Sequence, residues 1–188
     1  HPDVRIEGDS RQSRDLRHDI AADRMDIAVA IAPTQDEAYL VSAATITPIW
    51  AVAESFRWDR SVPLPLVRHP DPCEYAERMR NALRGVRRDW QTRLVSGDVA
   101  GVQAAVVAGI GASALTPATL VPGMRVGTQA EGFPPLTSLR IGLFYKHARL
   151  SKAAHALTQW LLQQVTLAGQ GAAGQGAGEQ GGVHKPSL

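Results

Sequence analysis

The stretch at residues 95–117, VSGDVAGVQAAVVAGIGASALTP, limits the folds open to this chain more than any other. Its apolar side chains recur over residues 99–110 at the spacing of one helix face, and Gly109 and Gly111 come where this helix ends. A dinucleotide-binding loop has the opposite order, because its glycines follow a strand and precede the helix that meets the pyrophosphate. We therefore interpret these glycines as a helix C-terminal cap within an α/β fold, and we do not expect a nucleotide site.

Hydrophobic patterning elsewhere predicts further strands and helices in alternation. The expected strands are residues 4–7, 27–32, 47–53, 64–69, 90–95, 112–117, 124–128 and 139–146. A polar helix should end near Ala22, with Leu16 and Ile20 on its buried face, and the last helix should open at Ser151. The pattern between the strands at residues 27–32 and 47–53 is ambiguous and predicts no element.

The sequence DPCE at residues 71–74 predicts the start of another helix. Asp71 is expected to cap it, Pro72 to occupy its first position and Glu74 to complete a capping box. Its apolar face should consist of Tyr75, Met79, Leu83 and Val86, and Glu74 should pair with Arg78 one turn later.

Two Pro-rich segments, residues 59–65 and 131–138, are interpreted as crossovers between two lobes. A chain of 188 residues is long enough for two small lobes with a core. We expect residues 1–60 and 139–167 in lobe I and residues 61–138 in lobe II. Residues 168–188 are rich in Gly, Ala and Gln, so we expect a disordered tail.

Composition excludes several classes of function. The formal charge of +2 is too small to predict nucleic-acid binding, and no apolar run predicts a membrane span. One cysteine and the opening HPDVRIEGDS, which lacks the features of a signal peptide, favour the cytoplasm. The six histidines have no metal-ligand spacing, and we expect neither a metal nor a cofactor. Because the sequence has no initiator Met, we expect either a natural fragment or an engineered truncation of a longer protein.

Three segments give the chain a resemblance to a known family. HPDVRIEGDS, RMDIAVAI and residues 101–121, GVQAAVVAGIGASALTPATLV, resemble motifs of the effector-binding domain of LysR-type transcriptional regulators. The resemblance implies the type 2 periplasmic-binding-protein fold, which has two Rossmann-like lobes joined by two crossovers. It also implies that the first strand and helix of lobe I, and the DNA-binding winged helix-turn-helix, lie outside this sequence.

The expected ligand site is the cleft between the lobes. In an open α/β sheet, ligands bind outside the carboxyl ends of the strands. His69, Ser96 with Gly97, and Thr116 with Pro117 lie at three such ends. Two helix N-termini, at residues 71–73 and 96–98, should also face the cleft and favour an anion.

Cys73 is expected in the same cleft, and two interpretations of it stay open. It is either a small wall residue or a thiol that senses redox state beside His69.

The resemblance implies an effector-binding region that senses a small molecule, pairs as a homodimer or homotetramer and contacts DNA only through the missing domain, and we expect no enzymatic activity. The alternative is a stand-alone solute-binding protein of the same fold. An α/β enzyme ranks last, because the sequence offers no nucleophile or acid–base pair with supporting neighbours.

Overall fold

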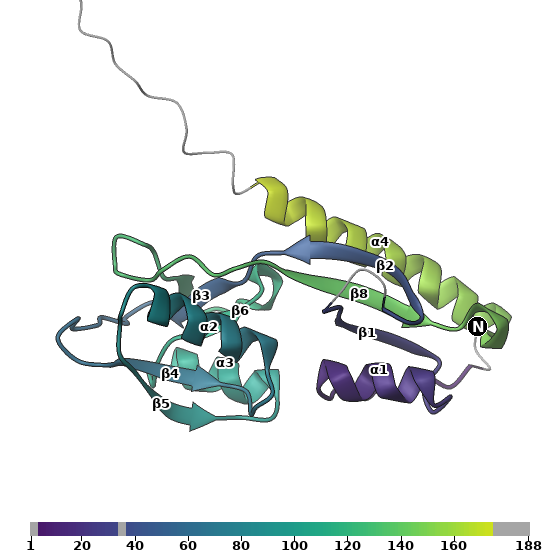
Figure 1. Ribbon diagram of the computed structural model, residues 1–188, viewed down its shortest axis with the longest axis horizontal. Helices are drawn as coiled ribbons and strands as arrows, with labels where there is room; N and C mark the ends of the chain where they lie inside the picture. The colour runs from purple at the N-terminus through teal and green to yellow at the C-terminus, as the bar shows by residue number, and fades with distance from the viewer. Residues whose placement is uncertain (1–3, 34–36, 175–188) are drawn as a thin grey trace, which may run out of the picture.

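The computed structural model describes residues 4–33 and 37–174, which form two lobes joined by two connections (Figure 1). The first lobe contains a sheet of three antiparallel strands in the order β1-β8-β2. Its elements are β1 (Ile27–Ile31), β2 (Leu40–Ile46), β8 (Leu139–Tyr145), α1 (Ser13–Ala21), the short helix η2 (His147–Arg149) and α4 (Lys152–Gly174).

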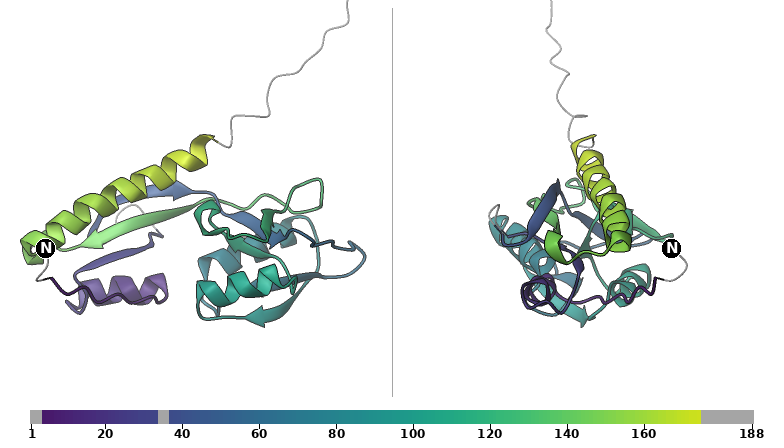
Figure 2. Two further views of the ribbon diagram at one scale, coloured as in Figure 1. Left: turned by 180° about the vertical axis from the view of Figure 1, so that it is seen from behind. Right: turned by 90° about the vertical axis from the view of Figure 1, so that its right-hand side faces the viewer.

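Helices cover both faces of the first-lobe sheet, as both views in Figure 2 show. Leu16 and Ile20 of α1 pack with Phe144 of β8 on one face. The neighbouring strand residues Leu143 and Tyr145 point to the other face and pack with Val165 of α4. This alternation is what a strand buried on both sides requires, because successive side chains point to opposite faces.

The second lobe combines two sheets. Its elements are β3 (Ile49–Ala53), β4 (Leu64–Arg68), α2 (Glu74–Gly85), β5 (Trp90–Val95), α3 (Val99–Val107), β6 (Ser113–Leu115), η1 (Pro117–Thr119) and β7 (Met124–Val126). Strand β3 lies antiparallel between β6 and β7, and β4 lies parallel to β5. A bridge between Leu66 and Ala112 joins the two sheets.

Alternating side chains of the second-lobe strands build one core against each helix. Trp50 and Leu66 pack in the core that contains α2, whereas Ala51 and Val67 pack in the core that contains α3. The helices therefore cover opposite faces of the sheet, as the sequence pattern of an α/β lobe predicts.

The two glycines after α3 have different structural roles. Gly109 has φ +75°, the left-handed conformation of a helix C-terminal cap, which confirms that prediction. A Cβ on Gly111 would lie 2.5 Å from the carbonyl oxygen of Pro65, so this position needs a glycine for the close approach to β4. Neither glycine precedes a helix as a nucleotide loop would.

The segment that the sequence pattern left ambiguous contains strand β2. Three sequence predictions about the elements are wrong. Residues 4–7 form no strand, and Ile6 is largely exposed. Asp71 does not cap α2, whose N-cap residue is Cys73. Val86 is exposed because α2 ends at Gly85, and Ala76 takes its place in the core beside Met79 and Leu83.

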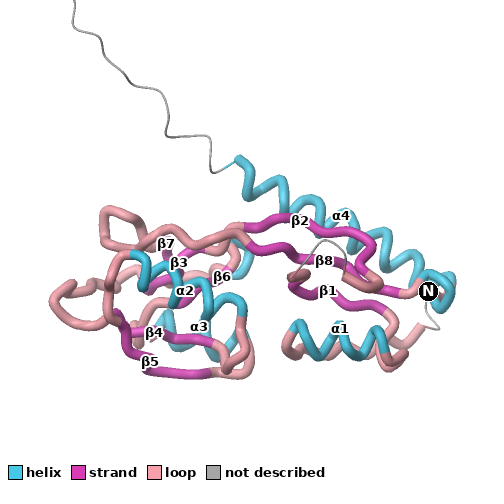
Figure 3. Tube along the Cα trace, in the orientation of Figure 1, coloured by secondary structure: helices cyan, strands magenta, loops and turns pink. Residues whose placement is uncertain are grey.

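The crossover predicted at residues 59–65 also has to be moved. Strand β3 pairs with β6 and β7, so the chain already passes between the lobes at Thr47 and Pro48. The return passage lies at Thr137 and Ser138, the end of the segment predicted at residues 131–138, because Phe133 and Leu136 still pack in the second-lobe core. The hydroxyls of Thr47 and Ser138 lie 2.9 Å apart in a hydrogen bond. Figure 3 shows the two connections side by side between the lobes.

Helix α4 continues to Gly174, which is past the start of the tail predicted at residue 168. The remainder of that predicted tail, residues 175–188, lies outside the described residues.

Candidate functional site

A cavity of about 710 Å³ lies where the first lobe faces the second. The first lobe contributes residues 10–14, Arg17 and Ile31, and the second lobe contributes residues 69–75, Glu77, Arg80 and residues 97–99. This volume lies within the range of small-molecule sites, and the walls come from segments far apart in the sequence.

Three arginines form the charged part of the first-lobe wall. Arg11 pairs with Asp19 at 2.6 Å, and Arg17 donates to the carbonyl oxygen of Ile31 at 2.5 Å. Arg14 is the most exposed of the three, with 69% of its side chain accessible, and its ion pair with Asp15 measures 3.4 Å. Of these three arginines, Arg14 therefore has the least constrained side chain.

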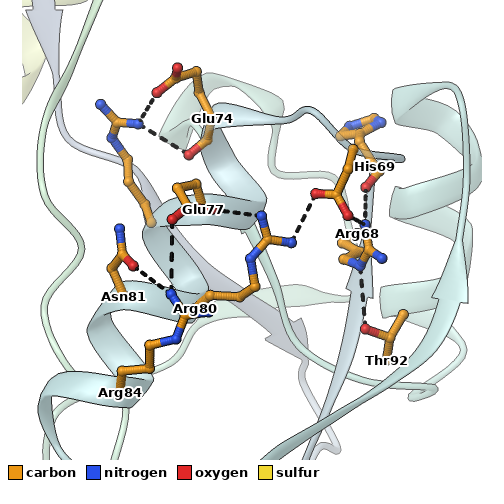
Figure 4. Close-up of polar contacts among 10 residues, drawn as sticks. Arg68, His69, Glu74, Glu77, Arg80, Asn81, Arg84 and Thr92 are labelled. Carbon is orange, nitrogen blue, oxygen red and sulfur yellow. Dashed lines mark hydrogen bonds and ion pairs between the residues drawn. The ribbon is translucent and has the colours of Figure 1, made fainter.

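The second-lobe wall carries a network of alternating charges (Figure 4). Asp71 accepts from Arg80 at 2.9 Å through one carboxylate oxygen and pairs with Arg68 at 3.0 Å through the other. Arg80 also binds Glu77 at 2.7 Å. The hydrogen bond from Arg80, reinforced by the charge of Arg68, lowers the pKa of Asp71, so this carboxylate stays ionised at neutral pH.

The two helix N-termini at the cavity differ. Asp98 caps α3 by accepting a hydrogen bond from the backbone N–H of Gly101 at 2.6 Å. Helix α2 has no side-chain cap, because Cys73 makes no such bond. The positive end of α2 is thus left without a capping side chain, and N–H groups in this state attract anions.

The cavity wall also contains a neutral phenol. Burial raises the pKa of Tyr75 to about 12. Its hydroxyl therefore stays protonated at every physiological pH and can offer a hydrogen bond without adding charge.

The structure brings some of the predicted site residues together. His69, Cys73 and Gly97 all line the cavity. A ring nitrogen of His69, Nδ1, lies 3.1 Å from the carbonyl oxygen of Ser96, which links the ends of β4 and β5. The parallel pairing of these strands explains why residues 27 apart in the sequence meet.

The other predicted residues lie off the cavity lining. The hydroxyl of Ser96 donates to the carbonyl oxygen of Asp98 at 3.1 Å and so stabilises the turn before α3. Thr116 and Pro117 lie at the start of η1, where the hydroxyl of Thr116 hydrogen-bonds that of Thr119 at 3.2 Å. None of these three residues is among those that line the cavity.

Sequence reasoning missed the arginines of both walls. Arg11, Arg14 and Arg17 are spaced three residues apart, and this spacing was the available signal that they share one side of a helical segment. The contacts of Asp71 with Arg68 and Arg80 had no such signal, because they join a strand, a loop and a helix.

Two other kinds of site find no support in residues 4–33 and 37–174. These residues contain no group of three or more His, Cys, Asp or Glu side chains able to hold a metal ion. Within the same ranges, no helix has the length and apolar character needed to cross a membrane.

The fold is similar to those of several solved regulators. The regulatory domain of HypT from Salmonella typhimurium is 12% identical with a TM-score of 0.63, over 83% of this chain and 80% of that one. The Synechocystis PCC6803 CcmR regulatory domain, solved in complex with 2-PG, is 14% identical with a TM-score of 0.57, over 82% and 80%. DarR from Vibrio fischeri, solved with DNA, is 13% identical with a TM-score of 0.60, over 82% of this chain and 56% of DarR.

These likenesses confirm the expected type 2 periplasmic-binding-protein fold. The model of the LysR substrate binding domain matches residues 1–166, which is most of the sequence. With a two-lobed fold, a cavity between the lobes and this match, the chain belongs to the LysR substrate-binding domain family.

Proposed function

We propose that this chain is the effector-binding region of a LysR-type transcriptional regulator and that it binds a small molecule in the cavity between its lobes. The observation that carries this proposal is the cavity itself, because both lobes contribute its walls. A ligand that contacts both walls favours one arrangement of the lobes by its differential affinity for that arrangement. A stand-alone solute-binding protein or an enzyme explains the family match less well.

The effector is an organic anion in this proposal. The first-lobe segments of the wall contribute three arginines and no carboxylate, and Arg14 is held by one long ion pair. On the second-lobe side, the N-terminus of α2, which has no side-chain cap, forms part of the wall, because Cys73, Glu74 and Tyr75 line the cavity. Guanidinium groups and helix N-termini are the groups that proteins use to bind carboxylates and phosphates.

The same proposal includes the self-association of the chain and its connection to DNA. The chain pairs as a homodimer or homotetramer, with residues 4–22 of one copy facing residues 74–88 of another. Residues 1–26 carry a net charge of −2 from five arginines and seven acids. Residues 68–93 carry +3 from seven arginines and four acids. DNA is contacted by a domain outside this sequence, in the cytoplasm.

A substitution that fills part of the cavity tests whether the effector binds there. Gly97 lines the cavity, and a Cβ added there meets no atom within 4 Å. Gly97→Leu should therefore fill part of the cavity without disturbing the fold. Gly85→Leu is the matched control, because Gly85 has equally open surroundings and does not line the cavity.

The readout is a thermal-shift screen of small carboxylates and phosphate esters, followed by calorimetry on any compound that raises the melting temperature. We expect at least one compound to stabilise the parent protein and Gly85→Leu, and Gly97→Leu to lose that response. Equal binding to Gly97→Leu would place the effector elsewhere and contradict the proposal.

A further inference from the structure

We propose that Asp71 is a built-in competitor for the effector: its carboxylate occupies a pair of arginines that an anionic ligand takes over. This inference rests on the proposed function of the cavity, since Asp71 and Arg80 both line it. In this proposal, Arg68 and Arg80 bind the anion, and competition from the Asp71 carboxylate sets the affinity and selectivity of the site.

The geometry around Asp71 is that of an anion bound between two cations. Oδ1 lies 2.9 Å from Nη1 of Arg80, and Oδ2 lies 3.0 Å from Nη1 of Arg68. Each oxygen therefore has its own guanidinium partner. A ligand carboxylate or phosphate has the same two-oxygen edge and can make the same pair of contacts.

Both arginines are held in place by groups other than Asp71. Nη1 of Arg68 donates to the carbonyl oxygen of His69 at 3.0 Å, and its Nε donates to the hydroxyl of Thr92 at 3.3 Å. Arg80 donates to Glu77 at 2.7 Å. Figure 4 shows Arg68 and Arg80 approaching each other from β4 and α2. The pair of guanidinium groups is thus preorganised whether or not Asp71 stays between them.

Asp71 is the more exchangeable partner. Its side chain is 51% exposed, whereas those of Arg68 and Arg80 are 19% and 21% exposed. It also lies in a loop between β4 and α2, where no helix or strand hydrogen bonds fix the backbone. Exposed ion pairs of this kind contribute little free energy, so a ligand with additional contacts can replace the carboxylate.

The charges left after such an exchange favour an anion. Without Asp71, three arginines (Arg68, Arg80 and Arg84) remain in this part of the second lobe with the single carboxylate of Glu77. Arg80 lines the cavity directly, in the wall across from Arg14 of the first lobe, and the other two arginines add positive charge behind it. An oxyanion held there contacts one lobe directly and is attracted to the other.

The experiment removes the competing charge and keeps its shape. Asp71→Asn is compared with the parent chain in calorimetric titrations with inorganic phosphate and with succinate at pH 7. Sodium chloride keeps the ionic strength constant and serves as the monatomic anion. We expect Asp71→Asn to bind phosphate or succinate roughly fivefold more tightly than the parent, the size typical of released exposed ion pairs. The relative response to the two probes distinguishes a phosphate-bearing from a carboxylate-bearing effector.

Two further variants identify the cause of any gain. Asp89→Asn makes the same charge change at the opposite end of β5, immediately before Trp90, and should leave both titrations unchanged. Adding Arg80→Gln to Asp71→Asn should abolish the gain, because one of the two guanidinium groups is lost. Should circular dichroism show that Asp71→Asn does not fold, Asp71→Ser makes the same test.

Binding by Asp71→Asn that is equal to or weaker than parental binding overturns the inference. So does an equal gain in Asp89→Asn, in chloride, or in the variant that also lacks Arg80. If the thermal-shift screen still finds a compound whose binding is lost in Gly97→Leu, only the role of Asp71 is contradicted. If the screen finds no such compound, the proposed function is contradicted as well.

Discussion

The two lobes are stabilised by differently organised cores. The second lobe builds a core on each face of its sheets: Trp50, Phe56 and Phe133 lie in the core under α2, and aliphatic residues form the core under α3. The first lobe has three strands, and among the described residues β1 pairs with β8 alone. Its buried aromatic residues, Phe144 and Tyr145, both belong to β8. The first lobe therefore depends on one strand far more than the second lobe depends on any of its own.

The difference follows the path of the chain. The second lobe is formed by one continuous segment between the two connections, whereas the first lobe joins residues before β3 to residues after β7. Closing the first-lobe sheet requires β8 to pair with strands about a hundred positions earlier, which makes this lobe dependent on long-range contacts. We expect the two lobes to differ in how they unfold.

The largest expected effect is that of Phe144→Ala. Phe144 is fully buried, and its truncation should lower the free energy of unfolding of the first lobe by about 3–5 kcal/mol. Trp50, Trp58 and Trp90 pack in the core of the second lobe, so tryptophan fluorescence mainly reports that lobe. Urea unfolding followed by fluorescence should change little, while the transition seen by far-ultraviolet circular dichroism moves to lower urea. Equal shifts of both signals would show that the lobes unfold as one unit.

Within the second lobe, the two glycines after α3 give the next largest effect. Gly111→Ala places a Cβ against the backbone of β4 and should cost about 1–3 kcal/mol. Gly109→Ala has open space around it and should cost about 1 kcal/mol, for its left-handed backbone alone. Thermal melts followed by fluorescence rank the two variants, and a greater loss in Gly109→Ala would contradict the assigned roles.

A smaller effect compares the two helix N-termini. Asp98→Ala removes the cap of α3 and should cost about 1 kcal/mol. Cys73→Ala removes no capping bond and should change stability by less than about 0.5 kcal/mol. Denaturant titration of both variants measures the difference, and similar losses would mean that Cys73 stabilises α2 by some other contact.

The smallest effect should appear only as a dependence on pH. Glu131 accepts from Arg125 and from the backbone N–H of Thr128, and these bonds lower its pKa to about 2. Its contribution is therefore complete above the ordinary pKa of a glutamate and is lost as pH falls through about 2. Glu131→Gln should melt below the parent at pH 6, and the gap should close as pH falls from about 4.5 toward 2. A gap that stays constant would rule out the carboxylate charge as its cause.

The sequence was most informative where neighbouring residues determine the structure. The unit from β5 through α3 to β6 was predicted from strand and helix patterning and from terminal glycines, all of which act within a few residues. The alternation at Val4 and Ile6 suggested a strand, but no partner strand pairs with these residues and they form none. Strand β2 gave no clear pattern, because its pairing with β8 rather than its composition determines its conformation.

The same distinction applies to the candidate site. The ends of β4 and β5 could be identified because parallel strands bring their carboxyl ends together, which placed His69 and Gly97 at the cavity. The arginine contacts of Asp71 depend on how α2 lies beside β4, a result of packing that no local pattern encodes. Thr116 was placed at the cleft by the same rule as His69, yet it lies at η1 and off the cavity lining.

The hydrogen bond between Thr47 and Ser138 has a consequence for the degrees of freedom of the molecule. A single connection would let one lobe twist as well as bend against the other. Two connections tied together resist twisting and leave mainly one rotation, the opening and closing that hinged domains show. Arg78 binds the carbonyl oxygens of Thr137 and Ser138 and also pairs with Glu74 on the cavity wall. The axis of that rotation is thus in direct contact with the helix that a ligand would touch.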